Sequence, residues 1–286
     1  MNAGFLGAIT AIGWGGSDFI ARFTGRGTDH FNALLGMLLS GAVFLTIYVY
    51  VTDMPIVWNW SSSWLIVGTG IGTMASTLLF YQSIIRGPIS VVSPIVGGYP
   101  GFSVLFALAM GVRPSPEDWL ATGVILTGVL TVARYSPVSN DPKHHDKSYN
   151  RKTVAIAVTA SFLFAITILF GQQAVPIYGE VQTTWLARYI SLASLLCLMF
   201  FNKSQKLNLP IKWWPLFCVQ GIIDSTGYIC LFAAGHLQNA EMAAVAASAF
   251  GAVTVLLARV FLKEVITLPQ WAGIIAIFSG VGFLAM

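Results

Sequence analysis

Long apolar runs alternate with short polar connectors along almost the whole of this sequence. A helix that crosses a bilayer needs about 20 mostly apolar residues, and inside hydrocarbon its backbone groups must be satisfied within the segment. The runs therefore predict transmembrane α-helices. Ten runs meet this requirement, over residues 3–22, 31–51, 64–86, 89–111, 118–135, 153–175, 183–201, 213–234, 241–262 and 268–286.

The composition supports a membrane protein and excludes a water-soluble globular domain. Of the 286 residues, 56% are hydrophobic and only 9% are charged, whereas soluble domains carry roughly 25% charged residues. So few charges cannot coat a water-facing surface, and lipid must be the solvent for much of it. We therefore predict an all-α, multi-pass protein of the cell membrane (inner or plasma membrane), with the lipid bilayer as its surroundings.

The basic residues are distributed unevenly among the nine connectors between the runs. The formal net charge is +4, but the charges lie in short stretches between apolar runs, which indicates a topology signal rather than a nucleic-acid surface. The even-numbered connectors and their flanks hold only Arg113. The odd-numbered ones hold Arg22, Arg26, Arg86, Arg134, Lys143, Lys147, Arg151, Lys152, Lys203, Lys206, Lys212 and Lys263. By the positive-inside rule, the odd connectors face the cytoplasm and both termini lie outside.

The chain divides into two units of five predicted spans. The longest connector, residues 136–152, is polar and basic, and it separates a first unit, residues 1–135, from a second, residues 153–286. Because five is an odd number, two copies of one unit must enter the membrane in opposite senses. Ten spans in two inverted five-helix repeats place a solute site near the midplane, where the halves can rock for alternating access.

Similar strings at the ends of the two units support a duplication. The first reads PGFSVLFALAMGVRPSPEDWLATGVILTGVL and the second GAVTVLLARVFLKEVITLPQWAGIIAIFSGVGFL. Trp119 matches Trp271 and Gly128 matches Gly280 at one offset. Each string predicts a helix, a short polar link, and then a helix that contains tryptophan and glycine, at the same place in each set of five spans.

Several motifs give the chain a resemblance to a known family. The first predicted span contains WGGS at 14–17, the ninth ends with LKE at 262–264, and Gln270 and Gly273 follow Glu264 at a matching spacing. With the two five-span halves, these features resemble the EamA-type family of the drug/metabolite transporter superfamily over essentially the whole chain. The resemblance implies a secondary transporter of a small organic metabolite, such as an amino acid or a related compound, with export the commoner direction.

The chain departs from the pattern of that family in three ways. Arg113 stands where the family often has a glutamate, and Gly251 stands where a helix proline is common. Both positions are interpreted as structural, so the expected fold is unchanged. The resemblance also implies cytoplasmic termini for many relatives, whereas the charge count places them outside. We take the orientation from the charge count, because it belongs to this chain.

Asp224 is the first candidate for a solute- or ion-binding residue. It lies roughly 16 Å into the eighth predicted span at 1.5 Å per residue, near the midplane, where an ionisable group is costly and marks function. Gln220 and Tyr228 lie one turn on either side and form a polar stripe with it. Asp224 can couple transport to protons or bind a cationic group. The alternative is a buried, protonated acid that hydrogen-bonds to a neighbouring helix.

Two further charged residues fall within predicted spans. Asp18 is a candidate binding residue together with Trp14 and Ser17, although an ion pair with Arg22, four residues later, is the favoured alternative. Arg188 lies near the start of the seventh span. It can hold a substrate carboxylate, or it can extend to the lipid headgroups.

The fourth and ninth predicted spans point to the centre of the molecule. Prolines and glycines between residues 94 and 101 predict a kinked or locally opened fourth span, which membrane proteins tolerate beside protein or a wet cavity. Small residues crowd the ninth span and favour either close helix packing or space for a ligand. Ser93 and Tyr99 in the fourth span, Ser248 in the ninth and Phe164 in the sixth are therefore further binding candidates.

The sequence contains no motif of a metal site, an ATPase or a hydrolase. The three cysteines lie in apolar segments without metal or disulfide spacing, and HExxH, GxSxG and phosphate-loop patterns are absent. We expect no cofactor, no enzymatic activity and no nucleic-acid partner, with a small solute and protons as ligands and a monomer or homodimer as the assembly. Two rival functions stay open: an intramembrane enzyme acting on lipid-linked substrates, and a non-transporting receptor or assembly partner.

Overall fold

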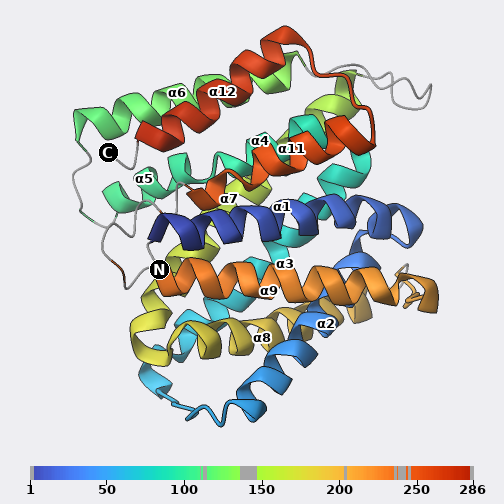
Figure 1. Ribbon diagram of the computed structural model, residues 1–286, viewed down its shortest axis with the longest axis vertical. Helices are drawn as coiled ribbons and strands as arrows, with labels where there is room; N and C mark the ends of the chain where they lie inside the picture. Colours follow the sequence, from blue (N-terminus) through green and yellow to red (C-terminus); the bar gives the residue numbers. More distant parts are fainter. Residues whose placement is uncertain are drawn as a thin grey trace.

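The described part of the chain folds entirely into helices and connectors, which confirms the predicted all-α class. The computed structural model describes residues 3–109, 111, 115–135, 147–202, 205–234, 237, 243 and 246–283 (Figure 1). Arg113 and residues 136–146 of the predicted linker lie outside this set. The α-helices are α1 (Ala3–Gly27), α2 (His30–Val51), α3 (Ser63–Arg86), α4 (Ile89–Gly97), α5 (Pro100–Ala109), α6 (Pro116–Arg134), α7 (Lys147–Tyr178), α8 (Glu180–Phe201), α9 (Trp214–Ala234), α11 (Phe250–Phe261) and α12 (Leu268–Phe283).

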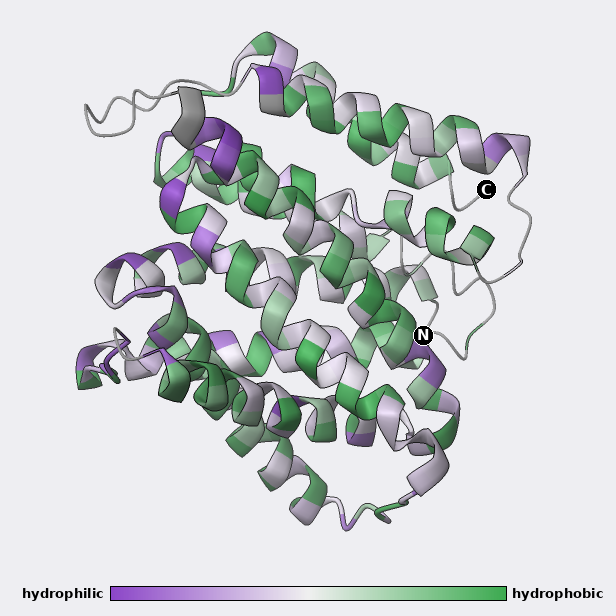
Figure 2. Ribbon diagram, turned by 180° about the vertical axis from the view of Figure 1, so that it is seen from behind, coloured by the Kyte–Doolittle hydropathy of each residue, from purple (hydrophilic) through white to green (hydrophobic). Residues whose placement is uncertain are grey.

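The helices coincide with the ten predicted spans. Within the described residues, six helical segments are long and apolar enough to cross a membrane: α2, α3, the α4–α5 pair, α7, α8 and α9. The apolar helices α6, α11 and α12 are shorter. Helix α1 has 25 residues and carries Asp18, Arg22 and Arg26 among its apolar residues. Figure 2 shows the hydrophobic residues along the helices and the most hydrophilic ones towards the helix ends.

The fourth predicted span is broken in the middle, as its prolines and glycines predict. Helix α4 ends at Gly97 and α5 begins at Pro100. Because Pro100 has no backbone N–H to donate to the carbonyl one turn earlier, the hydrogen-bond ladder of α4 cannot continue through it. The N–H of Gly98 instead closes the last turn by donating to the carbonyl oxygen of Pro94 at 3.1 Å. The break lies where α4 packs between α7 and α11.

The helix contacts follow a pseudo-two-fold pattern that relates the two units. Helix α1 packs on α9 as α7 packs on α3, and α2 packs on α9 as α8 packs on α3. Three further pairs, α2–α8, α4–α11 and α6–α12, join each helix to its own counterpart. Figure 1 shows α1 and its counterpart α7 running in opposite directions. This arrangement is the inverted duplication that an odd number of spans per unit requires.

The contact between α6 and α12 supports the same symmetry at the level of residues. A Cβ at Gly128 would lie 2.7 Å from the Gly273 carbonyl oxygen and 2.8 Å from Ile277 Cγ1. A Cβ at Gly280 would meet the counterparts of these residues, Ala121 and Ile125, at 2.9 and 2.7 Å. All these positions are related by the offset that matches Gly128 to Gly280 in the sequence. The glycines therefore let the two helices approach closely at symmetric points.

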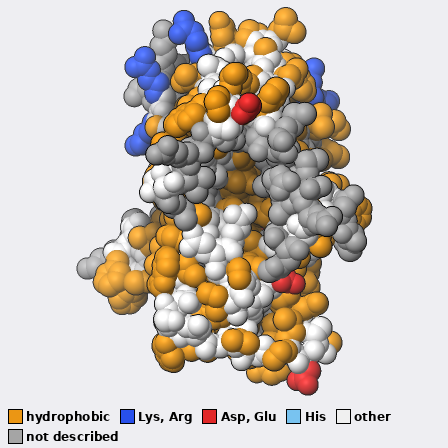
Figure 3. Space-filling view, turned by 90° about the vertical axis from the view of Figure 1, so that its left-hand side faces the viewer, with side chains coloured by type: hydrophobic (Ala, Val, Ile, Leu, Met, Phe, Trp, Pro, Cys, Tyr) orange, Lys and Arg blue, Asp and Glu red, His pale blue; other side chains and the backbone are white. Residues whose placement is uncertain are grey.

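The two ends of the helix bundle carry opposite charge. The connectors after α1, α3, α8 and α11 lie at one end, here named the basic end, together with Arg26, Arg86, Lys206, Lys212 and Lys263. The opposite end, which holds both chain termini, carries Asp53, Glu117 and Glu180 and no lysine or arginine among its described residues. Figure 3 looks at this second end and shows Lys and Arg side chains only near the upper edges of the view.

One side chain of α1 and one of the connector between α11 and α12 hold the short link between α3 and α4. The Glu264 carboxylate accepts hydrogen bonds from the backbone N–H groups of Ile89 and Ser90 at 3.2 and 3.0 Å, and so caps the N-terminus of α4. Arg22 donates from Nη1 to the carbonyl oxygen of Gly87 at 2.6 Å. The Glu264 contacts join the two units at the basic end, and the Arg22 contact lies within the first unit.

Candidate functional site

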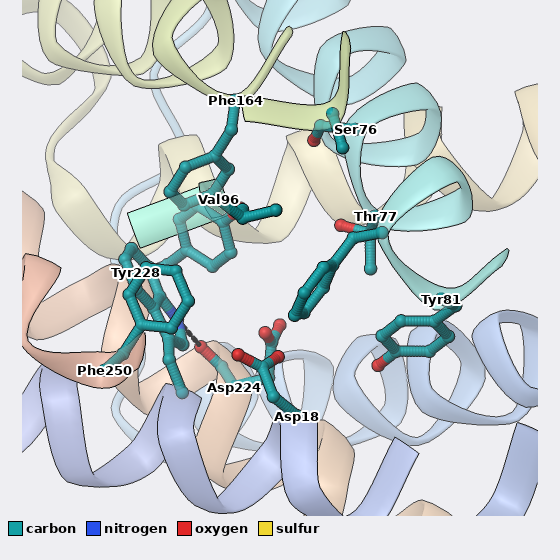
Figure 4. A pocket seen from close by; sticks show the side chains of 12 residues that line it. Asp18, Ser76, Thr77, Tyr81, Val96, Phe164, Asp224, Tyr228 and Phe250 are labelled. Atoms are coloured by element: carbon teal, nitrogen blue, oxygen red, sulfur yellow. Dashed lines mark hydrogen bonds between the residues drawn. The ribbon is translucent and has the colours of Figure 1, made fainter. Parts of the chain in front are cut away.

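A pocket at the centre of the bundle is lined by three helices from each unit. Its free space, including its open side, is about 420 Å³. Figure 4 shows the lining side chains converging on this space. They are Trp14 and Asp18 of α1, Ser76, Thr77, Phe80 and Tyr81 of α3, Val96 of α4, Ala160 and Phe164 of α7, Asp224 and Tyr228 of α9, and Phe250 of α11.

Asp224 forms a salt bridge with Arg188, a residue of a different helix. Arg188 Nη2 lies 2.6 Å from Asp224 Oδ2 and also donates to the Ser225 hydroxyl at 3.1 Å. Its Nη1 lies 3.3 Å from the sulfur of Met37. The side chain of Arg188 is only 2% exposed, so the alternative that it extends to the lipid headgroups is wrong. A buried guanidinium needs a charged partner, and Asp224 supplies it.

Asp18 lies beside Asp224 on the pocket wall (Figure 4). Within the described residues, no side chain or N–H group makes a hydrogen bond or salt bridge with its carboxylate, although the residue is only 9% exposed. The ion pair with Arg22 that the sequence favours does not occur. In the described part of the chain, the one salt bridge between an acidic side chain and a lysine or arginine joins Arg188 to Asp224. Asp18 therefore faces the pocket with no cationic partner among the described residues.

Gln220 lies behind the pocket and contacts Tyr81, which is not among the candidates from the sequence. Its Nε2 donates to the Tyr81 hydroxyl at 2.5 Å and to the Ser17 carbonyl oxygen at 3.2 Å. Gln220 and Ser17 are buried and do not line the pocket, whereas Tyr81 does. Tyr81 belongs to a long apolar helix, and no local sequence signal separates it from a packing residue. Gln220 thus holds Tyr81 in place rather than facing the solute space.

Aromatic rings form one side of the pocket around Trp14. The Trp14 ring packs edge-to-face with Phe164, Tyr228 and Phe250, with ring centroids 5.3, 4.9 and 5.9 Å apart. Its indole N–H donates to the backbone carbonyl oxygen of Asp224 at 3.3 Å. These four aromatic residues come from four helices, and the structure brings together three sequence candidates, Trp14, Phe164 and Tyr228.

Three other candidates lie outside the pocket lining. The Ser248 carbonyl would be 3.2 Å from a Cβ at Gly97, and the Ser93 carbonyl would be 2.8 Å from one at Gly251. Ser93 of α4 and Ser248, just before α11, therefore lie where these two segments approach closely. Tyr99 packs its ring against Phe164, with centroids 4.9 Å apart, behind the aromatic wall. Their positions support packing rather than contact with a solute in this conformation.

A second, smaller cavity lies on the other side of Tyr228. Arg188 and Tyr228 line it together with Thr69, Thr73, Thr184, Ala187 and Phe232. Tyr228 borders both cavities, and the guanidinium carbon of Arg188 lies 5.8 Å from the centre of its ring. A single aromatic side chain and the buried ion pair thus separate two spaces near the middle of the bundle.

Comparisons with known proteins agree with a transporter. The model of the EamA-like transporter family matches residues 1–134 and again residues 151–286. The chain is 23% identical, over 81% of its length and 68% of the relative's, to a protein named uncharacterized transporter sll1319 from Synechocystis sp.. A solved structure described only as a crystal structure of protein has a TM-score of 0.65 and 14% identity, and the match covers 98% of this chain and 95% of that one. This last likeness shows the fold alone.

Proposed function

Because the chain belongs to the EamA-like transporter family, we propose that it is a proton-coupled secondary transporter that exports a small organic metabolite and holds it in the central pocket. The protein is a multi-pass membrane protein whose family transports solutes. The pocket carries the proposal, since both units contribute to its wall and it contains buried carboxylates at mid-helix depth. Amino acids and related compounds are the solutes that the family resemblance implies.

Alternating access follows from the duplicated construction. If residues 1–135 and 153–286 act as two inverted units, a rocking motion between them opens the pocket to one side of the membrane while it closes the other. Tyr228 and the Arg188–Asp224 pair would form the barrier towards the end that holds the termini. The Glu264 and Arg22 contacts would close the basic end. The charge distribution supports a cytoplasmic basic end.

Proton coupling is supported by the charges around the pocket. Asp18 and Asp224 bring two negative charges, and Arg188 brings one positive charge. Fully ionised, the group has a net charge of −1 in a low-dielectric interior, which is costly unless a proton or another cation neutralises it. A proton taken up on one side of the membrane and released on the other would supply the driving force.

The rival functions have less support in the described part of the chain. The family model and the curated relative are both named as transporters, which favours transport over an intramembrane enzyme. A receptor would not need a pocket divided equally between two units. Both rivals predict that solute flux is absent.

Filling the pocket is expected to stop transport without unfolding the protein. Thr77→Trp places an indole in the pocket from α3, so proton-gradient-driven flux of transported metabolites in proteoliposomes should fall at least about tenfold as the solute loses its space. Thr127→Trp makes the same change on the exposed face of α6 and should leave flux intact. Wild-type protein that moves nothing from a broad metabolite panel, with or without the gradient, would overturn the proposed function.

A further inference from the structure

We propose that the transported solute is an organic cation, a protonated amine with an apolar or aromatic body, and that Asp18 is its counter-ion. This inference rests on the proposed function and narrows it, because it selects one substrate class for the same pocket. It departs from the amino acids that the family resemblance implies. Its basis is the distribution of charge and aromatic surface around the pocket.

The guanidinium group of Arg188, near the pocket, already has partners within the protein. Both terminal nitrogens of Arg188 are occupied, Nη2 by Asp224 and the Ser225 hydroxyl and Nη1 by the Met37 sulfur. Arg188 also lines the second cavity rather than the central pocket. No lysine or arginine is among the described residues that line the central pocket. A carboxylate on the solute would therefore meet no cationic partner there, and it would lie close to two carboxylates.

The carboxyl group of Asp18, in contrast, is available to a solute. Asp18 faces the pocket, and within the described residues its carboxylate forms no hydrogen bond or salt bridge. An ammonium group has donors and a positive charge, and so it satisfies this carboxylate and brings the net charge of the Asp18, Asp224 and Arg188 group to zero. Recognition of a cation removes the cost of a buried, unpaired charge, which gives the site its selectivity.

The aromatic wall suits the remainder of such a molecule. Trp14, Phe164, Tyr228 and Phe250 meet edge-to-face on one side of the pocket, and Phe80 and Tyr81 lie on α3 (Figure 4). Aromatic faces attract cations by their quadrupole and bury apolar surface, and their effect is larger where water is excluded. A pocket with one free carboxylate and several aromatic rings matches the chemistry that recognises amines.

The test uses four ligands with the same phenyl ring and different charge. Phenethylamine is a cation, phenylalanine a zwitterion, 3-phenylpropionate an anion and 3-phenylpropanol neutral. Titration calorimetry with the purified protein should show the amine binding about tenfold to a hundredfold more tightly than the other three, as expected for a charge-assisted contact. Flux in proteoliposomes should follow the same order. The overturning result is that phenylalanine or the alcohol binds as well as the amine, or that the amine does not bind.

A substitution that removes the charge of Asp18 tests its role as the counter-ion, with the same substitution at an exposed acid as the control. Asp18→Asn should remove the preference for the amine, whereas Asp53→Asn makes the same change at an exposed acid far from the pocket and should keep it. Asp18→Glu keeps the charge and should keep most of the preference if Asp18→Asn fails to fold. A full preference for the amine in a folded Asp18→Asn protein would overturn the assignment of Asp18.

A pH series gives a second readout of the same contact. Asp18 faces Asp224 on α9 and Tyr81 on α3, with Arg188 on α8 behind Asp224. Because an ammonium group binds the ionised carboxylate, amine affinity should fall as the pH is lowered and protons occupy Asp18. Affinity that does not change with pH would contradict this competition.

If phenylalanine is transported and phenethylamine is not, the substrate inference fails while the proposed transport function stands. If no solute moves, the function itself fails.

Discussion

Arg188→Met is expected to lower the free energy of unfolding by about 3–5 kcal/mol, because it leaves the Asp224 carboxylate buried without its cation. The methionine retains most of the volume of the arginine stem, so the loss of packing is small. The measurement is reversible or kinetic unfolding of the purified protein in detergent, monitored by circular dichroism. A change smaller than about 1 kcal/mol would contradict a buried pair, since exposed salt bridges contribute no more than this.

Two further variants separate the ion pair from other effects of the substitution. Arg151→Met removes an exposed arginine at the basic end and should change stability little. The double variant Arg188→Met, Asp224→Asn removes both charges and should recover much of the loss, since neither partner is left uncompensated. A double variant as unstable as the sum of the two single variants would show that the two side chains act independently.

Gly221→Ala is expected to destabilise the protein by roughly 1–3 kcal/mol, because α2 and α9 touch at this point. A Cβ at Gly221 would lie 2.5 Å from the backbone nitrogen of Gly41 and 2.6 Å from the carbonyl oxygen of Met37. Both are backbone atoms, so the helices themselves must separate. The same contact holds Ser225 and Arg188 beside α2, and the separation would therefore also weaken the ion pair.

Gly123→Ala is the matched control for this steric argument. Gly123 lies in the middle of α6 on an exposed face, and a Cβ there would have no atom within 4 Å. Alanine is the better helix former, so this variant should be neutral or more stable by up to about 1 kcal/mol. The thermal midpoints of the two variants should therefore move in opposite directions. Equal shifts would remove the evidence for close packing of α2 on α9.

The helices and the repeat could be predicted from sequence because the signals that produce them are local. Each apolar run specifies its own helix in lipid, and the prolines and glycines of the fourth run locate its break. The match of Gly128 with Gly280 predicted a duplication, and their symmetric contacts in the α6–α12 pair agree with it. The inverted arrangement then follows from the odd number of spans in each unit.

The site was only partly predictable because its contacts join residues far apart in the chain. The position of Asp224 near mid-helix could be read from the sequence, but its partner Arg188 lies on α8 and no spacing links the two. The separation of four residues favours an ion pair between Asp18 and Arg22 over a binding role, whereas the fold turns Arg22 to the Gly87 carbonyl. Tyr81 lines the pocket through the packing of α1, α3 and α9, which no local sequence pattern predicts.

The most direct test of the central claim measures access to the pocket from each side of the membrane. Thr77→Cys in a background without the three native cysteines would be exposed to a membrane-impermeant thiol reagent, added to one side of sealed vesicles at a time. Leu130→Cys, on the exposed face of α6, serves as the lipid-facing control. Alternating access predicts labelling of Thr77→Cys from both sides, with a transported solute slowing it, and no labelling of Leu130→Cys. Labelling of Thr77→Cys from neither side, or from one side under every condition, would contradict a solute site that opens alternately between two inverted units.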